Sequence, residues 1–309
     1  MKTYISFLVV FVFFQLKVSS KETQMYLYYK YSNLAEIFIC KNEYSKALNS
    51  YKSAFSESKI SFAIDIQNAI VCATICNNPK EIMYLCELLS KKGVGKNYFS
   101  QEIFKKYQND KSFQKIINNA EIIKNKFKNN NEIFINKYET LIKNDSLYNK
   151  YRHDSLLHMH QLPDYVQLLF ERNTKSLLNL INEYGYYGEN NIGVLLVNDT
   201  SFVKFHRANV ILIHYLQMGT NPVLKDEIKN MLAKNIENGC MRNNELNTIM
   251  TLCANEYDNL GNNIYTINDC YLFKNTNYTD LSEINKTRNK YYLSMDITLL
   301  PKASFLTLL

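Results

Sequence analysis

The sequence predicts a mainly all-helical protein, and two observations lead to this prediction. Glycine and proline are scarce, with 8 and 4 among 309 residues, whereas a β-sandwich or barrel would need a turn signal about every 8–12 residues. Apolar residues also recur at helical spacing through most of the chain. The chain is long enough for one large domain or two ordinary domains, each with its own core.

The first twenty residues, MKTYISFLVVFVFFQLKVSS, are typical of a secretory signal peptide. Lys2 gives a positive start, and the apolar stretch from Ile5 to Leu16 is too short to span a membrane. Ser19 and Ser20 supply the small residues before a cleavage site ahead of Lys21. We therefore expect an exported protein, periplasmic or extracellular, with no transmembrane span after cleavage.

A repeat of helical hairpins is predicted next. Leu34, Ala35 and Phe38 mark one face of a helix, residues 41–43 form a turn, and a second helix follows. This stretch resembles a tetratricopeptide repeat, whose signature positions are filled by Tyr31, Leu34, Ala35, Phe38, Tyr44, Ala47, Tyr51 and Ala54. Lys59 stands where that family has a terminal proline. The resemblance implies a helical solenoid that binds a protein or peptide.

A second hairpin is predicted over residues 62–89, from apolar stripes that begin at Phe62 and Ile82. Asn78 is suited to cap its second helix, Pro79 to the first helical position, and Glu81 to a capping box. Gly93 then ends the helix. Because at least three repeats are usually needed to bury a solenoid, we expect helices within residues 100–128 to complete the stack. A boundary near 129–131 then separates a hairpin domain, 21–130, from a second domain, 131–309.

The second half is predicted to be helical, with one small β-hairpin near its end. An amphipathic segment covers residues 132–151, and Thr174 is expected to cap a helix that Gly185 closes. A glycine-containing loop leads to an apolar helix over residues 203–216, and Pro222 opens a helix that ends at Gly239. Three further elements are expected: a helix around Leu246 to Cys253, a hairpin at 262–273 and a helix over 282–292.

Residues 140–300 resemble an uncharacterised bacterial domain family that is common in Bacteroidetes and often joined to helical repeats. The elements that carry this resemblance are Asn179 to Gly185, Ile192-Gly193, Ile213-His214, Leu260-Gly261-Asn262-Asn263 and Arg288. The family's Ala-Asp after the histidine is Tyr215-Leu216 here, and its Thr-Gln pair is Asn262-Asn263. The resemblance implies a helical fold and offers no activity.

One ligand site is suggested by this alignment. It would gather His214, Arg288 and Asn262 or Asn263 in a polar pocket, where the histidine acts as acid or base and the arginine holds an anion. The glycines of the same elements, Gly185, Gly193 and Gly261, are included in this candidate ligand site. No catalytic residue is identified, and no phosphate-binding loop or nucleophile elbow is present in the sequence.

The other titratable residues favour structural roles. His153, His158 and His160 do not share a face of a helix, so we predict a polar cluster there and no metal site. His206 is expected to be a buried neutral histidine of the core. The seven cysteines are Cys40, Cys72, Cys76, Cys86, Cys240, Cys253 and Cys270. Their spacing resembles no zinc site, which favours buried thiols, and a bridge from Cys240 to Cys253 or Cys270 remains open.

Charge bears on the choice of partner. The net charge of +7 is scattered among acidic residues, and the densest basic run, 124–128, holds three lysines. A nucleic-acid surface needs a concentrated basic patch, so no nucleic-acid partner is expected. No cofactor is expected either, since the sequence has no glycine-rich phosphate-binding loop. The leading hypothesis is an exported adaptor that binds a protein or peptide, with enzymatic activity left open. The alternatives are an enzyme or small-ligand module that uses His214 and Arg288, and a structural component of the envelope.

Overall fold

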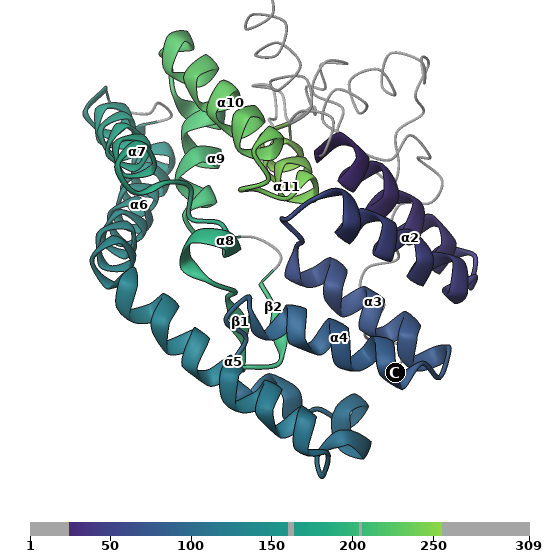
Figure 1. The fold of residues 1–309 in the computed structure, drawn as a ribbon. Coiled ribbons are helices and arrows are strands. Elements are labelled where there is room, and N and C mark those ends of the chain that lie inside the picture. The colour runs from purple at the N-terminus through teal and green to yellow at the C-terminus, as the bar shows by residue number, and fades with distance from the viewer. Residues whose placement is uncertain (1–24, 160–163, 204–205, 255–309) are drawn as a thin grey trace, which may run out of the picture.

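The computed structural model describes residues 25–159, 164–203 and 206–254 (Figure 1). Over these residues the fold is mainly all-α with one two-stranded antiparallel sheet, which confirms the predicted fold class. None of the described helices is long and apolar enough to cross a membrane. The predicted signal peptide, the hairpin predicted at 262–273 and the helix predicted at 282–292 all lie outside the described residues.

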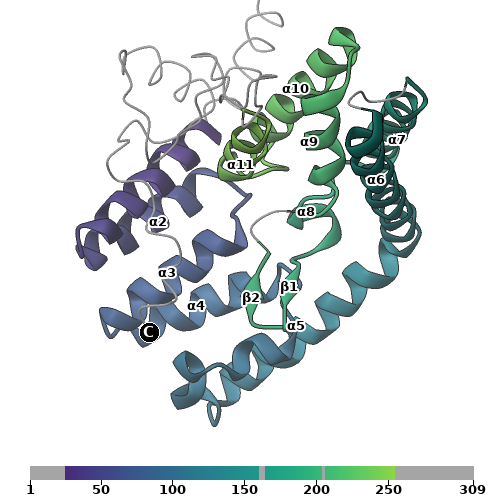
Figure 2. The same cartoon turned by 180° about the vertical axis from the view of Figure 1, so that it is seen from behind.

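Four helices of the first half lie side by side, as Figures 1 and 2 show. They are the helix 25–40, α2 (Tyr44–Glu57), α3 (Ala63–Ile75) and α4 (Pro79–Ser90). The tetratricopeptide-like positions Ala35, Ala47, Tyr51 and Ala54 are fully buried. Tyr31, Phe38 and Tyr44 pack partly buried against the core, and Leu34 is half-buried. The hairpins are therefore formed, while membership of the tetratricopeptide family remains a prediction.

Three of the predicted signals at the ends of α4 are confirmed, those of Asn78, Pro79 and Gly93, whereas the predicted capping box is not formed. The Glu81 carboxylate pairs with Lys52 at 3.0 Å, and the Asn78 N–H bonds the Ala73 carbonyl instead. The Asn78 side chain accepts a hydrogen bond from the Glu81 N–H at 3.2 Å, and Pro79 is the first helical residue. After the helix, Gly93 adopts φ +80°, where a side chain would be strained and its Cβ would lie 2.8 Å from the Phe127 ring. The local sequence thus fixes both ends of this helix.

Two of the predicted buried thiols lie inside this stack. Cys72 on α3 and Cys86 on α4 are fully buried in the same hydrophobic cluster. Burial raises the pKa of Cys72 to about 12 and raises the pKa of Cys86 as well. Both act as small apolar side chains rather than as nucleophiles, because the reactive form of cysteine is the thiolate.

The predicted third unit of the stack is present, although part of it is 3₁₀-helical. It comprises η1 (Lys96–Ser100), η2 (Glu102–Tyr107) and α5 (Lys111–Asn130), and α5 packs on α4. Asp110 caps α5 by accepting the Ser112 N–H at 2.7 Å. The ring centroid of Phe104 lies 5.4 Å from that of Phe99 and 5.9 Å from that of Phe113, so aromatic packing holds these short elements together.

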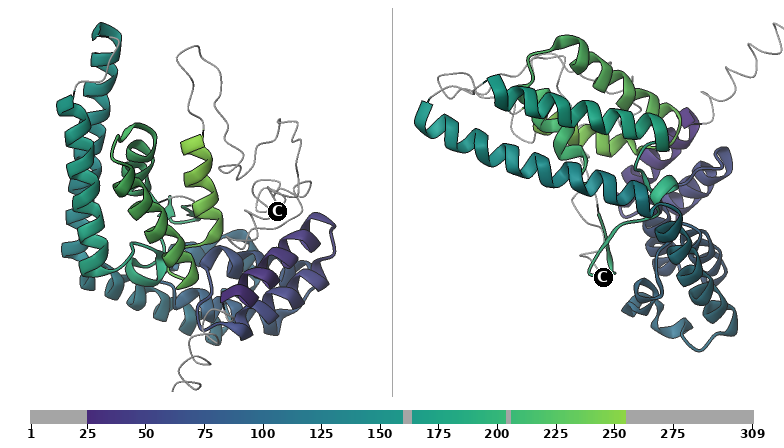
Figure 3. Two further views of the ribbon diagram at one scale, coloured as in Figure 1. Left: turned by 90° about the horizontal axis from the view of Figure 1, so that it is seen from above. Right: turned by 90° about the vertical axis from the view of Figure 1, so that its left-hand side faces the viewer.

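A long antiparallel pair, α6 (Glu132–Met159) and α7 (Asp164–Tyr184), rises on one side of the molecule, opposite the helices of the first half (Figure 3). The rings of Phe134 and Tyr184 stack at 5.4 Å. The prediction that Thr174 caps a helix is wrong. Because the apolar stripe continues upstream through Val166 and Phe170, α7 begins ten residues earlier, and Thr174 is buried within it. Gly185 closes α7 with φ +86°, as predicted.

The chain between α7 and α9 (Asn209–Met218) differs from the predicted loop and helix. It forms a short helix, α8 (Glu189–Ile192), followed by β1 (Leu196–Val197) and β2 (Ser201–Phe202). The strands pair with Leu196 opposite Phe202, and Asn198 and Asp199 adopt positive φ in the turn between them. The helix predicted from Val203 therefore begins only at Asn209. The missed signal is Asn198-Asp199, because these residue types tolerate the left-handed turn conformation.

Two more helices, α10 (Pro222–Glu237) and α11 (Asn243–Ala254), complete the described fold. Asn221 caps α10, and Gly239 follows it with φ +67°. Met25, Tyr28 and Tyr29 of the first helix belong to the same hydrophobic core as the residues of α6, α7 and α9 to α11. The apolar core thus continues across residue 130, and the division into domains 21–130 and 131–309 remains a prediction.

Candidate functional site

The sequence-predicted residue His214 forms a buried pair with Asp145. Its Nδ1 lies 2.8 Å from Asp145 Oδ2, and the side chains are 16% and 3% exposed, respectively. His214 is on α9 and Asp145 is on α6. The ring of Phe170 on α7 meets the imidazole edge to face, with the two ring centroids 5.9 Å apart. The carboxylate is thus almost completely removed from water, whereas part of the imidazole remains accessible.

The pair follows from the way in which α9 packs along α6. The ring centroid of His206, just before α9, lies 5.1 Å from that of Tyr138 on α6. His214 contacts Asp145, which is seven residues after Tyr138 on the same helix. The segment 206–214 and α6 therefore run in the same direction. Asn173 of α7 donates a hydrogen bond to the Leu141 carbonyl at 2.9 Å, which holds the third helix of this layer against α6.

This geometry fixes how the imidazole carries its proton. An ionised carboxylate only accepts hydrogen bonds, so Asp145 requires a proton on Nδ1 of His214. In the neutral ring, Nε2 is then an unprotonated base. Asp145 Oδ1 has no hydrogen-bond partner within the described residues, so the ring of His214 is the one partner found there for this carboxyl group. The arrangement suits proton transfer at Nε2.

The remaining sequence-predicted site residues are not assembled around His214 in the described structure. Arg288, Asn262, Asn263 and Gly261 lie outside the described residues. Gly185 ends α7, where an added Cβ would meet the Asn191 side chain, and Gly193 packs against Phe127 of α5. Both glycines have positive φ, which accounts for them as turn residues.

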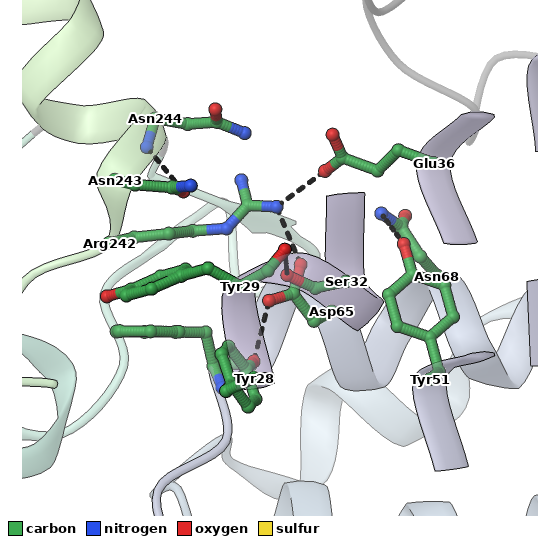
Figure 4. Close-up of polar contacts among 12 residues, drawn as sticks. Tyr28, Tyr29, Ser32, Glu36, Tyr51, Asp65, Asn68, Arg242, Asn243 and Asn244 are labelled. Carbon is green, nitrogen blue, oxygen red and sulfur yellow. Dashed lines mark hydrogen bonds and ion pairs between the residues drawn. The ribbon is translucent and has the colours of Figure 1, made fainter. Parts of the chain in front are cut away.

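A second polar cluster joins the two ends of the described chain (Figure 4). Arg242, immediately before α11, places Nη2 2.8 Å from Glu36 and 2.6 Å from Asp65. Tyr28 donates a hydrogen bond to the other oxygen of Asp65 at 2.7 Å. Desolvation lowers the pKa of Arg242, but the charges of Asp65 and Glu36 outweigh it and raise the pKa overall. The arginine is therefore a permanently charged centre that links the first helix, α3 and α11.

This Arg242 cluster continues at the N-terminus of α3. Tyr28 Oη accepts the Phe62 N–H at 3.0 Å, and the Glu189 carboxylate accepts the Ala63 N–H at 2.9 Å. Lys92 pairs with Glu189 at 3.2 Å. Burial raises the pKa of Glu189, an effect that Lys92 opposes. Every member has a protein partner, which is typical of a network that orders the fold.

A third polar group surrounds Glu245 of α11. Asn209 Nδ2 and the Tyr186 hydroxyl donate to Glu245 Oε1, and the Tyr187 hydroxyl donates to Asn209. Burial raises the pKa of Glu245 to about 7, and the nearby Glu189 charge acts in the same direction. His206, predicted to be a neutral core histidine, is buried beside Tyr187, and burial lowers its pKa to about 3.

Glu245 leads to a prediction about pH. Because its folded pKa lies above the ordinary value of 4.5, the folded state holds a proton that the unfolded state releases, and its contribution to stability is lost as the pH rises from 4.5 through about 7. Replacing Glu245 with Gln is expected to flatten this decline in the free energy of unfolding. Urea titrations across that pH range measure it, with the exposed Glu237→Gln as control. An unchanged slope in Glu245→Gln would contradict the prediction.

The described residues contain no cluster of three or more His, Cys, Asp or Glu side chains that could hold a metal ion. Several tyrosines of the first two helices belong to the core. Tyr28, Tyr29 and Tyr51 are completely buried, and Tyr26 is exposed. Aromatic packing inside the stack explains these tyrosines.

Asp145 and Arg242 are the residues that sequence reasoning missed. Asp145 lies 69 residues from His214 and belongs to a helix with many polar residues, so no local pattern distinguishes it. Arg242 lies between Gly239 and α11, 177 residues from Asp65.

No known protein family, curated protein or solved structure matches this chain. The function is therefore argued from the site itself.

Proposed function

We propose that the helical layer of α6, α7 and α9 binds a small ligand and transfers a proton at Nε2 of His214. The 2.8 Å contact between His214 Nδ1 and the buried Asp145 carries this proposal. A carboxylate behind a histidine orients the ring, selects the tautomer and stabilises the imidazolium that forms when Nε2 accepts a proton. His214 would be the general base or acid, and Asp145 its positioning residue.

Accessibility supports this assignment in preference to a purely structural histidine. His214 keeps 16% of its side chain exposed, whereas His206 is buried between tyrosines. His206 Nδ1 accepts the Ala208 N–H at 3.2 Å, so its ring is held neutral inside the core. His214 therefore has the accessibility expected of a reactive histidine, whereas His206 has the burial expected of a structural one.

Removing the charge of Asp145 is expected to make Nε2 of His214 a weaker nucleophile. The reaction of each histidine with diethyl pyrocarbonate, which acylates unprotonated imidazole, is followed by mass spectrometry. Asp145→Asn should slow modification of His214 about tenfold or more, since hydrogen bonds to charged groups contribute about 1.5–3 kcal/mol. Glu139→Gln on the same helix, whose partner Arg207 is 3.7 Å away and exposed, should leave the rate unchanged.

The same experiment contains an internal comparison. His206 is expected to resist modification in the folded protein because it is buried. Equal rates for His214 in wild type and Asp145→Asn would remove the basis of the proposal. Equal rates for His214 and His206 would show that the accessible nitrogen of His214 does not differ from that of a core histidine.

Protein binding by the helical hairpins is a second candidate function. The formed stack of the helix 25–40, α2, α3 and α4 favours it, and Tyr84 and Ile75 are exposed on α4 and α3. Repeat stacks commonly present interaction surfaces, an analogy at the level of the fold. Capture of a partner that is lost in Tyr84→Ser, with folding retained, would support this function.

A further inference from the structure

We propose that Asn173 of α7 is a positioning residue of the His214 site, which fixes where Asp145 stands relative to the imidazole. This inference rests on the proposed function of His214 and adds what holds its pair in place. Asn173 is buried, and its Nδ2 donates a hydrogen bond to the Leu141 carbonyl oxygen at 2.9 Å. In an α-helix the carbonyl of one residue accepts the N–H of the residue four positions later, so the Leu141 carbonyl also accepts the N–H of Asp145. Asn173 therefore binds the turn of α6 that ends at Asp145.

Asn173 is the polar member of an apolar stripe. Buried residues of α7 recur at spacings of four and three through Val166, Phe170, Asn173 and Leu177. The matching stripe of α6, with Asp145 as its polar member, comprises Phe134, Tyr138, Leu141, Asp145 and Tyr148. This spacing is that of a coiled-coil seam, where one buried asparagine lowers stability but specifies the register of the helices. The hydrogen bond of Asn173 explains why a polar residue is placed in this seam.

The other contacts between α6 and α7 are less directional or are exposed. The rings of Tyr148 and Phe170 pack edge to face, with their centroids 6.0 Å apart. The second side-chain hydrogen bond between these helices in the described residues, from Lys137 to the Tyr184 hydroxyl at 2.9 Å, is exposed. Apolar burial is non-directional, whereas a hydrogen bond requires a defined distance and angle. Asn173 therefore supplies the buried directional contact that sets the axial position of α7 along α6.

One face of α7 contacts both sides of the His214 pair. Phe170 precedes Asn173 by three residues and so lies on the same face of the helix, and its ring meets the imidazole of His214. Asn173 holds the turn that ends at Asp145. The contact of 2.8 Å between His214 Nδ1 and Asp145 Oδ2 is lost beyond about 3.5 Å, so a displacement of less than about 1 Å is enough to break it. Asn173 thus acts on His214 through Asp145.

The test measures the tautomer of His214 in the full chain from its ring ¹⁵N chemical shifts at alkaline pH. Asn173→Leu removes the amide donor at similar volume, and the ratio of the Nδ1–H form to the Nε2–H form should fall about threefold or more, as expected for the loss of one hydrogen bond. In the Asp145→Leu background, Asn173→Leu should change this ratio no further.

A neighbouring residue of α7 provides the matched control. Thr174 is fully buried, and its hydroxyl has no hydrogen-bond partner within the described part of the chain, so Thr174→Val should match wild type. The urea midpoint of each variant checks that it is folded. Asn173→Ser repeats the test if Asn173→Leu does not fold, because a serine in a helix bonds a carbonyl of its own helix and is too short to reach Leu141.

The outcomes separate this inference from the proposed function. A wild-type His214 with its proton on Nδ1, together with an unchanged tautomer ratio in the folded Asn173 variant, overturns the role of Asn173 and leaves the pair intact. A further shift of similar size in the Asp145→Leu background shows that Asn173 does not act through Asp145, which also overturns the positioning role. A wild-type His214 with its proton on Nε2 overturns the proposed function, whatever the Asn173 variants do.

Discussion

Replacing Arg242 with Met is expected to lower the free energy of unfolding by about 3–5 kcal/mol, the usual effect of leaving one charge of a buried pair without its partner. Asp65 has 1% of its side chain exposed and would keep only the Tyr28 hydroxyl as a partner. Glu36 would lose its contact at 2.8 Å. Urea unfolding of wild type and variant measures the difference.

A matched arginine provides the control for this prediction. Arg207 lies 3.7 Å from Glu139 and is 70% exposed, so Arg207→Met should change the free energy of unfolding by less than about 1 kcal/mol. The double variant Arg242→Met, Asp65→Asn should be more stable than Arg242→Met alone, because the buried negative charge is removed with its partner. Similar effects of Arg242→Met and Arg207→Met would show that the Arg242 cluster does not join the two halves of the chain.

Gly188→Ala is expected to destabilise the fold by about 1–3 kcal/mol or more through overpacking. A Cβ at this position would overlap the backbone carbonyl oxygen of Cys240, and no rotation of a side chain can relieve this clash. Asn190 donates to the Gly239 carbonyl at 2.8 Å across the same contact. The substitution therefore pushes α8 away from the turn that carries Arg242.

Gly95→Ala is the control for this close approach. Its nearest contacts are with the end of the Lys124 side chain, which can move away, and its backbone φ of −77° is ordinary for alanine. We expect a small change in the thermal midpoint for Gly95→Ala and a large decrease for Gly188→Ala. Since Gly188→Ala and Arg242→Met disturb the same contact, their combined effect should be smaller than the sum. Additive effects would contradict this coupling.

Much of the helical architecture could be predicted because its signals are local. Asn78 and Pro79 mark the start of α4, and Pro222 marks the start of α10. Gly185 and Gly239 occupy the positive-φ positions that their places after helices suggested. These signals depend on backbone sterics and capping within a few residues, so one sequence is sufficient to detect them.

The errors arose where tertiary packing overrides a local signal. Thr174 is a good capping residue by type, yet it is buried within α7 because the helix continues upstream along its apolar face. The segment before Asn209 was expected to be helical, whereas Asn198 and Asp199 form the turn of a short hairpin. In both places the correct structure depends on neighbours that are far away in the sequence.

The candidate site could be predicted only in part for the same reason. His214 was identified by a family resemblance, but its partner Asp145 is brought to it by the parallel packing of α9 along α6. Pairing across 69 residues requires the fold.

The most direct test of the proposed site is the tautomer of His214, read from its ring ¹⁵N chemical shifts at alkaline pH. The contact with Asp145 predicts a proton on Nδ1 and an unprotonated Nε2 in the wild-type protein. Asp145→Leu, which removes the acceptor but retains an apolar side chain, should shift the population toward the Nε2–H form. A wild-type His214 with its proton on Nε2, or one identical to that of Asp145→Leu, would contradict the assignment of His214 and Asp145 as a proton-transfer pair.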